Sequence, residues 1–171
     1  DKLVTGVQTC ALPISTRTRW SLTIAGDGPQ RARLESLVDE LKVRGAVRFM
    51  GAVDNASVRS LLLEHDVFAL PCRVDSAGDK DGIPVVLMEA MASGVPVVSG
   101  DLEAIRELIQ HDQSGLLVDG ARVEPTRDAL ARLAEDPSLR MRLGSAGRQR
   151  VIDEFSLETN ITRLEAAMGL G

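Results

Sequence analysis

The chain has 171 residues, of which 44% are hydrophobic and 26% are charged, and its formal net charge is −5. This length and composition suit one domain of ordinary size. The acidic balance excludes a global positive field for nucleic acid, and three Phe, one Trp and no Tyr offer little surface for base stacking, so we expect no nucleic-acid partner.

From Trp20 onward, short apolar runs alternate with stretches of helical periodicity. Buried strands are predicted at 20–26, 47–51, 67–71, 95–100 and 115–118. Helices are predicted at 29–43, at 56–65, from Pro84 to a stop at Gly94, at 102–109, and in three C-terminal segments at 124–135, 137–154 and 157–168. Strands joined by helices imply right-handed crossovers. The predicted fold is therefore a doubly wound α/β domain, with a parallel sheet covered by helices on both faces and extra C-terminal helices.

Residues 1–15 do not follow this alternation. The stretch "DKLVTGVQTCALPIS" has no sustained period and resembles translated adapter or vector sequence, so we interpret it as a non-native leader, with the domain at 16–171. The alternative is a short native strand and loop. We expect these residues to form no strand of the central sheet.

The cysteines, the apolar runs and the N-terminus bear on the compartment of the protein. Cys10 and Cys72 have neither a disulfide-scaffold nor a metal-ligand spacing. No apolar run approaches the ~20 residues that span a bilayer, and the N-terminus lacks the pattern of a secretory signal. These features predict a soluble, cytoplasmic protein.

Several polar features have ordinary structural explanations. "DKD" at 79–81 matches a pattern that binds a divalent metal, but acidic loops are usually only solvated. His65 and His111 could act as bases, although caps or exposed positions are commoner for such residues. Cys72 suits a small buried residue at a strand end. The four arginines of one helical segment could face an anionic membrane or could form a solvated helix face: Arg140, Arg142, Arg148 and Arg150.

"GDGP" at 26–29 lies between a predicted strand and a predicted helix. Backbone amides at such a place can face an anion. A dinucleotide-binding fingerprint would need glycine three residues after Gly28, and Arg31 stands there instead. The segment is either a tight turn, with Pro29 starting the helix, or a turn that also contacts a ligand.

The segment "DGIPVVLMEAMASGVPVV" at 81–98 carries the clearest functional signal. Its helix is apolar on every face apart from one carboxylate, Glu89, which we expect to lie inside. Pro84 suits the first helical turn and leaves nearby amides free for a phosphate. Asp81 precedes that turn, so both carboxylates could line one cleft at the carboxyl edge of the sheet. Alternatively, Glu89 faces an arginine across a packed interface.

These residues resemble the donor-binding half of retaining glycosyltransferases of family four of the GT-B fold, also called glycosyl transferases group 1. Asp81 and Glu89 match the spacing of that family's Glu-x7-Glu motif. Further matching segments follow in order over residues 20–165: "LTIAGDGP", "VRFMG", "HDVFALPCR", "SGLLV" and "RVIDEFSLE".

The resemblance implies a role for each matched position. Glu89 would accept hydrogen bonds from the ribose of the donor nucleotide, and Asp81 would hold hydroxyls of the transferred sugar; these two are the candidate catalytic residues. Phe49, Met50 and Gly51 would lie by the base. The implied donor-binding set is Gly26, Gly28, Met50, Gly51, Asp81, Gly82, Ile83, Pro84, Val85 and Glu89. Enzymes of this kind need no metal ion, so no cofactor is expected, and the partner would be a nucleotide-diphosphate sugar.

The sequence also departs from the family. The commoner motif begins Glu-Gly-Phe-Gly, whereas this one begins Asp-Gly-Ile-Pro, as in a branch that resembles polysaccharide-building enzymes. The family's diphosphate-neutralising Arg and Lys would lie before Trp20, and Arg17 and Arg19 do not match them. The acceptor-binding half is not seen either, so we expect a truncated donor domain that is inactive alone, in the cytoplasm or at the inner face of a membrane.

Three other functions remain open at this stage. The domain could bind a nucleotide-sugar without catalysis, could belong to a GT-B-type nucleotide-sugar epimerase, or could be an unrelated α/β interaction protein in which Glu89 is structural.

Overall fold

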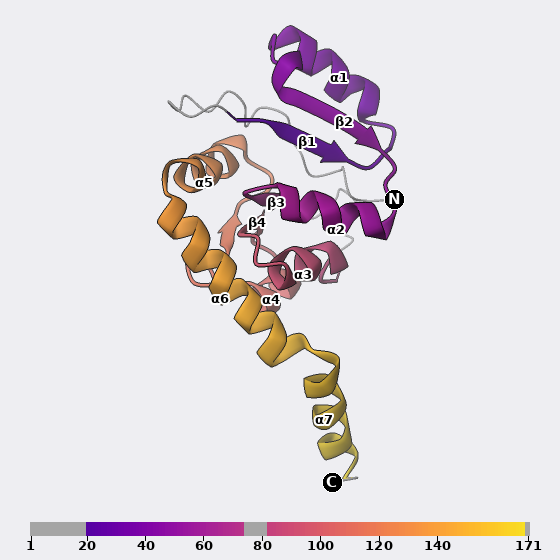
Figure 1. Cartoon of the computed structure of the whole chain (residues 1–171), viewed down its shortest axis with the longest axis vertical. Coiled ribbons are helices and arrows are strands. Elements are labelled where there is room, and N and C mark those ends of the chain that lie inside the picture. The colour runs from indigo at the N-terminus through magenta and orange to yellow at the C-terminus, as the bar shows by residue number, and fades with distance from the viewer. Residues whose placement is uncertain (1–19, 74–81, 170–171) are drawn as a thin grey trace.

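The computed structural model of the chain describes residues 20–73 and 82–169 (Figure 1). The strands are β1 (Leu22–Ala25), β2 (Val47–Gly51), β3 (Phe68–Leu70), β4 (Val97–Gly100) and β5 (Leu116–Val118). The helices are α1 (Arg31–Glu40), the 3-10 turn η1 (Arg44–Ala46), α2 (Asn55–Glu64), α3 (Val85–Ala92), α4 (Glu103–Leu108), α5 (Val123–Glu135), α6 (Pro137–Phe155) and α7 (Leu157–Met168). Each predicted strand and helix is present within a few residues of its predicted bounds. The doubly wound α/β class is therefore confirmed.

Among the described residues, the strands form two parallel sheets rather than the single sheet that was predicted. β1 pairs with β2 in parallel, and β3, β4 and β5 form a second parallel sheet in that order. Parallel strands pair at about 4.8 Å. Residues of β1 and of β3 both line a cavity of about 470 Å³. Within the described part of the chain, no ladder joins these two strands.

A side-chain hydrogen bond connects β1 to the segment between α2 and β3. Nε2 of His65, just after α2, lies 2.8 Å from the hydroxyl of Thr23 in β1, and Nδ1 lies 2.7 Å from the carbonyl oxygen of Leu61. Both ring nitrogens are thus engaged. His65 is the C-cap of α2, so the expectation of a capping role is confirmed, and the ring adds a contact to β1.

The core lies around β4, whose residues are all buried. On one side, Val97 packs with the buried face of α3 and with Ile105 and Leu108 of α4. On the other side, Val98 packs with Leu116, and with the α5 and α6 residues Leu133 and Leu143. Because apolar residues cover both faces, the strand shows a continuous apolar run rather than alternation.

Helix α6 crosses close to the end of α3. A Cβ atom added at Gly144 would lie 2.2 Å from the carbonyl oxygen of Gly94, and one added at Gly147 would lie 2.9 Å from that of Ser114. Only glycine permits an approach this close. α6 is therefore packed backbone against backbone on the segment that follows α3.

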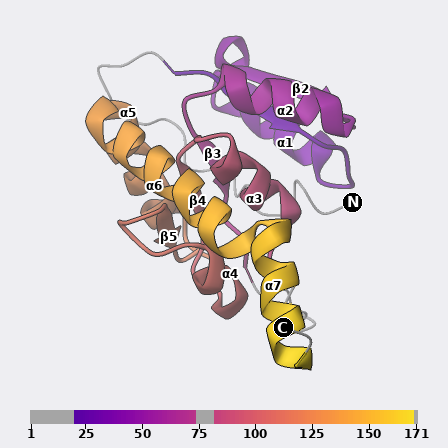
Figure 2. The same cartoon turned by 60° about the horizontal axis from the view of Figure 1, so that its bottom comes forward.

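Helix α7 extends away from the rest of the domain (Figures 1 and 2). Its apolar stripe is uncovered: Leu157, Ile161, Leu164 and Met168 are 46–76% exposed. These residues recur at helical spacing, so they form one apolar face of the helix.

Residues 1–15, interpreted as a non-native leader, lie outside the described residues, so that interpretation stays a prediction. Within the part of the chain that the structure describes, no helix is long and apolar enough to cross a bilayer.

Candidate functional site

The loops that follow β1 and β2 meet at the carboxyl ends of these strands. The amide of Gly26 donates to the carbonyl oxygen of Gly51 at 2.7 Å. Both glycines have positive φ, +123° and +72°, which side-chain-bearing residues rarely adopt. Gly28 belongs to the same turn, where its carbonyl oxygen accepts from the amide of Arg31 at 3.1 Å. The structure thus brings together Gly26, Gly28 and Gly51, with Met50 beside them at the end of β2.

Arg31 contributes a cation to this turn that the sequence analysis did not assign to the site. Its guanidinium lies 3.0 Å from a carboxylate oxygen of Glu35 and 3.6 Å from one of Asp27. It also lies 5.9 Å from the ring centre of Phe49. A Cβ atom on Gly51 would come within 3.3 Å of it. The same residue that excludes the dinucleotide fingerprint therefore closes one side of this turn.

A second group of candidate residues is at the N-terminus of α3. Pro84 is the N-cap, in an extended conformation, and the helix begins at Val85, one residue later than expected. The carbonyl oxygen of Pro84 accepts from Leu87 at 3.0 Å. A proline side chain cannot cap the amides that follow it, so no side chain of the N-cap residue accepts from the first amides of the helix, those of Val85 and Val86. Gly82 and Val85 are exposed, and Ile83 and Pro84 are half-buried.

Glu89 is exposed, and the expectation that it lies inside the fold is wrong. The buried face of α3 consists of Leu87, Ala90 and Met91, whereas Val85 and Glu89, one turn apart, share the exposed face. The helix packs on one side only, so its apolar sequence does not mean burial all round. Among the described residues Glu89 has no arginine partner, which contradicts the packed-interface alternative within that part of the chain.

The segment after β3 is held tightly at this edge. The hydroxyl of Ser99 donates to the carbonyl oxygen of Leu70 at 2.8 Å, fully buried. A Cβ atom on Gly100 or Gly120 would lie 1.8 or 2.2 Å from the carbonyl oxygen of Cys72. The loops after β3, β4 and β5 therefore touch through their backbones. Cys72 is half-buried at the strand end, with its chain direction fixed by these contacts.

The two groups of candidate residues follow strands of different sheets. Each follows the carboxyl end of its strand, where doubly wound folds bind ligands. Figure 1 shows the arrowheads of β1 and β2 pointing to the same side. Within residues 20–73 and 82–169, no hydrogen bond joins the glycine turn to α3. Asp81, the second candidate catalytic carboxylate, lies outside the described residues, as does the rest of "DKD".

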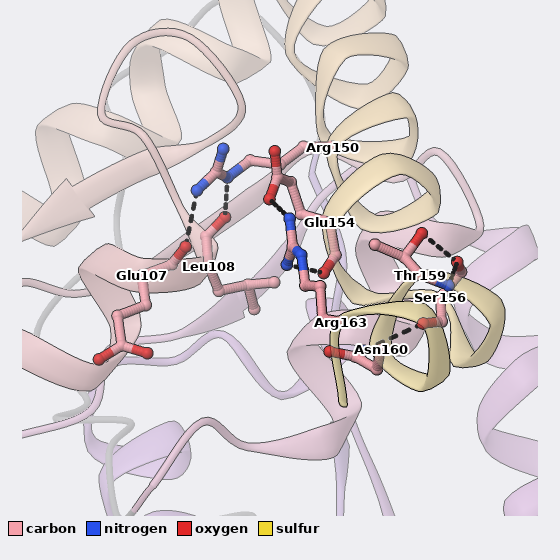
Figure 3. Close-up of polar contacts among 8 residues, drawn as sticks. All are labelled: Glu107, Leu108, Arg150, Glu154, Ser156, Thr159, Asn160 and Arg163. Atoms are coloured by element: carbon pink, nitrogen blue, oxygen red, sulfur yellow. Dashed lines mark hydrogen bonds and ion pairs between the residues drawn. The ribbon is translucent and has the colours of Figure 1, made fainter. Parts of the chain in front are cut away.

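Other candidate residues serve structural contacts. Nδ1 of His111 accepts from the amide of Leu117 at 3.0 Å. Nη1 of Arg140 donates to the carbonyl oxygen of Leu133 at 2.6 Å, and Nη1 of Arg142 to that of Asp112 at 2.8 Å. Arg150 donates to carbonyl oxygens at the end of α4 (Figure 3). Three of the four arginines thus bind backbone within the fold. No cluster of three metal-ligating side chains occurs in the described part of the chain.

Sequence comparison connects this arrangement to known proteins. The model of the family glycosyl transferases group 1 matches residues 8–150. The chain is 37% identical, over 145 residues, to a GDP-mannose-dependent alpha-(1-6)-phosphatidylinositol monomannoside mannosyltransferase of Mycobacterium tuberculosis. That match covers 84% of this chain and 38% of the relative. The putative colanic acid biosynthesis glycosyltransferase WcaL of Salmonella typhimurium is 39% identical over 140 residues, covering 82% of this chain and 30% of that protein.

Structural comparison agrees with the fold. The structure of Anabaena HepE in complex with UDP superimposes with a TM-score of 0.82 at 18% identity, over 99% of this chain and 46% of HepE. The chain spans well under two thirds of the length of the curated relatives that it matches. Because the family model matches most of its length, the chain belongs to the glycosyl transferases group 1 family.

Proposed function

We propose that this chain is the donor-binding half of a retaining glycosyltransferase, which moves a sugar from a nucleotide-diphosphate sugar to a glycan or lipid-linked acceptor. The observation that carries the proposal is the geometry of α3. Its first amides have no side-chain cap, and Glu89 is exposed on the same helix, ~6 Å further along the axis at 1.5 Å per residue. Amides suit a phosphate, and a carboxylate suits paired hydroxyls.

The roles follow from these positions. Glu89 would accept hydrogen bonds from the ribose, and the amides at Val85 and Val86 would donate to the diphosphate or the sugar. The glycine turn at Gly26, Gly28 and Gly51 would lie by the base, since these three residues bring no side chain of their own, and Arg31 would border it on one side. Asp81 would hold hydroxyls of the transferred sugar. Charge on the leaving group would be stabilised by these donors rather than by a nucleophilic side chain.

We further propose that no divalent metal ion takes part, as the family resemblance implies. A helix N-terminus can offset part of a diphosphate's charge without an ion. The matching test is to measure nucleotide affinity with EDTA and with added magnesium. Equal affinities support the proposal, and a requirement for magnesium contradicts it.

The relatives support the class of acceptor. One is named for a phosphatidylinositol monomannoside acceptor and the other for colanic acid biosynthesis. We therefore propose a role in polysaccharide or cell-envelope biosynthesis. We do not extend the proposal to direct contact with a membrane, because Arg140, Arg142 and Arg150 already bind carbonyl groups of the fold.

The test of the donor site is calorimetry of Glu89→Gln with UDP and with GDP. Loss of a charge-assisted hydrogen bond should weaken binding by about 1.5–3 kcal/mol, or roughly tenfold to over a hundredfold. The matched control is Glu165→Gln, which removes an exposed carboxylate from α7. Equal affinity in Glu89→Gln and the parent, given measurable binding by the parent, would contradict the ribose role.

A transfer assay separates an enzyme from a binding module. We expect residues 1–171 to bind a donor nucleotide but to transfer no sugar, because the reaction in GT-B enzymes takes place between two domains, and orientation and exclusion of water contribute much of the rate. Labelled nucleotide-sugars are incubated with mixed acceptors, with and without a relative's remaining domain fused. Product analysis also detects an epimerase. Efficient transfer by residues 1–171 alone would contradict the proposal.

A further inference from the structure

Arg31 and Asp27 place a hydrogen-bond donor beside a hydrogen-bond acceptor at the glycine turn. Nη1 of Arg31 lies 3.6 Å from Oδ2 of Asp27. The same nitrogen is the atom that a Cβ on Gly51 would approach, at 3.3 Å. Asp27 itself lies between Gly26 and Gly28 in the chain. The pair therefore stands beside the backbone of all three glycines of the turn.

Both side chains are oriented by their other contacts. Nε of Arg31 donates to Oε1 of Glu35 at 3.0 Å, and the guanidinium lies 5.9 Å from the ring centre of Phe49. Oδ1 of Asp27 accepts from the amide of Gly28 at 2.8 Å. Nη1 and Nη2 of Arg31 donate no hydrogen bond to any described residue. Since the side chains of Arg31 and Asp27 are 36% and 56% exposed, a ligand can reach the remaining donors and acceptors.

The charges at the turn do not suit a phosphate. Asp27 and Glu35 bring two carboxylates to one guanidinium, that of Arg31, so the three side chains carry a net negative charge. A diphosphate would be repelled there, whereas the first amides of α3 offer it donors. A neutral group that has both donors and acceptors suits the pair. In a nucleotide-sugar, the base is such a group.

The turn also has room for a planar ring. A Cβ atom added at Gly28 would meet no atom of the described residues within 4 Å, so the space beside this residue is open. Asp27 is exposed and Gly28 is half-buried. A flat ring can therefore approach the glycine backbone without displacing a side chain of the turn.

The order of donor and acceptors distinguishes guanine from uracil. The Watson–Crick edge of guanine presents the acceptor O6, then the donors N1–H and N2–H₂, whereas that of uracil presents an acceptor, a donor and a second acceptor. A guanidinium beside a carboxylate, whose two oxygens both accept, complements the guanine edge. Against uracil, one oxygen of Asp27 would face another acceptor, and both groups would lose hydrogen bonds to water.

We propose that Arg31 and Asp27 bind the base of the donor nucleotide and select guanine. The guanidinium donates to O6, and the carboxylate accepts from N1–H and N2–H₂. This inference rests on the proposed function, which puts the base beside the glycine turn. Arg31 and Asp27 are specificity-determining residues that touch no reacting atom, and Glu35 and Phe49 act through Arg31 as positioning residues.

The test compares GDP with inosine diphosphate, which lacks the N2 amino group, by calorimetry on the full chain. The parent should bind GDP at least about tenfold more tightly than inosine diphosphate or UDP, because a site built to bind an N–H rejects the analogue without it. Asp27→Ala should bind GDP and inosine diphosphate about equally. Arg31→Ala should weaken both and leave their ratio unchanged, since both bases carry O6.

The matched control is Asp39→Ala, which removes another carboxylate of α1 whose partner is Arg44. It should keep the ratio of the parent. Because both nucleotides are measured on the same variant, a loss of folded protein cancels in the ratio. A structural role of Asp27 would therefore not change it.

Two results would overturn the inference and leave the proposed function standing. One is a parent that binds UDP, CDP or ADP as tightly as GDP, and the other is a ratio in Asp27→Ala equal to that of the parent. In either case Glu89→Gln would still weaken binding of every nucleotide by a similar factor, because all of them carry the ribose. A parent that binds no nucleoside diphosphate would overturn the proposed function and this inference together.

Discussion

Arg150 of α6 donates its Nε–H to the carbonyl oxygen of Leu108, the last residue of α4, at 2.8 Å (Figure 3). A second donor of the same guanidinium reaches the carbonyl oxygen of Glu107 at 2.7 Å. The last carbonyl groups of a helix have no partner within it. A cation from another helix thus caps α4 and fixes α6 across it.

Replacing Arg150 by Gln should therefore destabilise the fold. Hydrogen bonds to charged groups contribute about 1.5–3 kcal/mol, and part of the loss comes from carbonyl groups left without a partner. Urea unfolding measures the change. Arg148→Gln is the control, because Arg148 is exposed and has no polar partner among the described residues. Equal loss in the two variants would contradict the capping role.

Substitution of Gly100 by Ala should be among the most damaging changes near the carboxyl edge. The new Cβ would lie 1.8 Å from the carbonyl oxygen of Cys72, so backbone must move. Overpacking of this kind costs about 1–3 kcal/mol or more. Gly45→Ala is the control, since nothing lies within 4 Å of its Cβ position. The urea midpoints of the two variants are compared with that of the parent. If the midpoint of Gly100→Ala falls no further than that of the control, the backbone at Cys72 can move aside at little cost in stability.

The pair of Asp101 and Arg106 should make stability depend on pH in a defined direction. The guanidinium of Arg106 donates to both carboxylate oxygens of Asp101, at 2.6 and 2.9 Å, and lowers the pKa of that carboxyl below its usual value near 4. A lowered folded-state pKa adds stability above the unfolded-state pKa, and that contribution is lost as the pH falls through the folded-state pKa.

Asp101→Asn should accordingly lower the free energy of unfolding at pH 7 by less than about 1 kcal/mol, because both side chains are largely exposed. The difference from the parent should shrink as the pH falls from 7 to 3. Glu40→Gln removes an exposed carboxylate without a described partner and is the control. A difference that grows on acidification would reverse the expected sign.

The apolar stripe of α7 should promote self-association. Leu157 and Leu164 are 76% and 60% exposed, and exposed apolar patches of this kind favour contact between molecules. Sedimentation velocity at increasing protein concentration measures it. The double variant Ile161→Gln, Leu164→Gln should associate less than the parent, while Thr162→Gln, on another face, should not differ. If the double variant associates as strongly as the parent, the contact between molecules does not involve the apolar stripe of α7.

The sequence predicted the elements well because their signals are local. Apolar runs such as "VPVVSG" lie in strands that are buried on both faces, and the stop at Gly94 follows from its positive φ of +77°. Gly26 and Gly51, two members of the donor-binding set that the resemblance implies, meet in the structure because each ends a strand and the carboxyl ends of paired parallel strands share one edge.

Features that depend on contacts between distant parts of the chain could not be predicted from the sequence. The exposure of Glu89 depends on which face of α3 has neighbours, and an almost wholly apolar helix gives no sign of this. The division of the sheet depends on the spacing between β1 and β3, which are more than 40 residues apart in the chain. Arg31 was considered only as the residue that breaks a glycine pattern, although a cation four residues before a glutamate on a helix is itself a signal of an ion pair.

The close approach of α6 at Gly144 and Gly147 leaves the helix little freedom to shift relative to its neighbours. Side chains can rotate to absorb a displacement, but at these two positions α6 meets Gly94 and Ser114 with no side chain between the backbones. Its far end joins α7 through the capped corner at Ser156, where Arg163 also binds Glu154 (Figure 3). A displacement of α6 along its axis would therefore reach the end of α3, the helix that carries Glu89, with no side chain between the two backbones to absorb it.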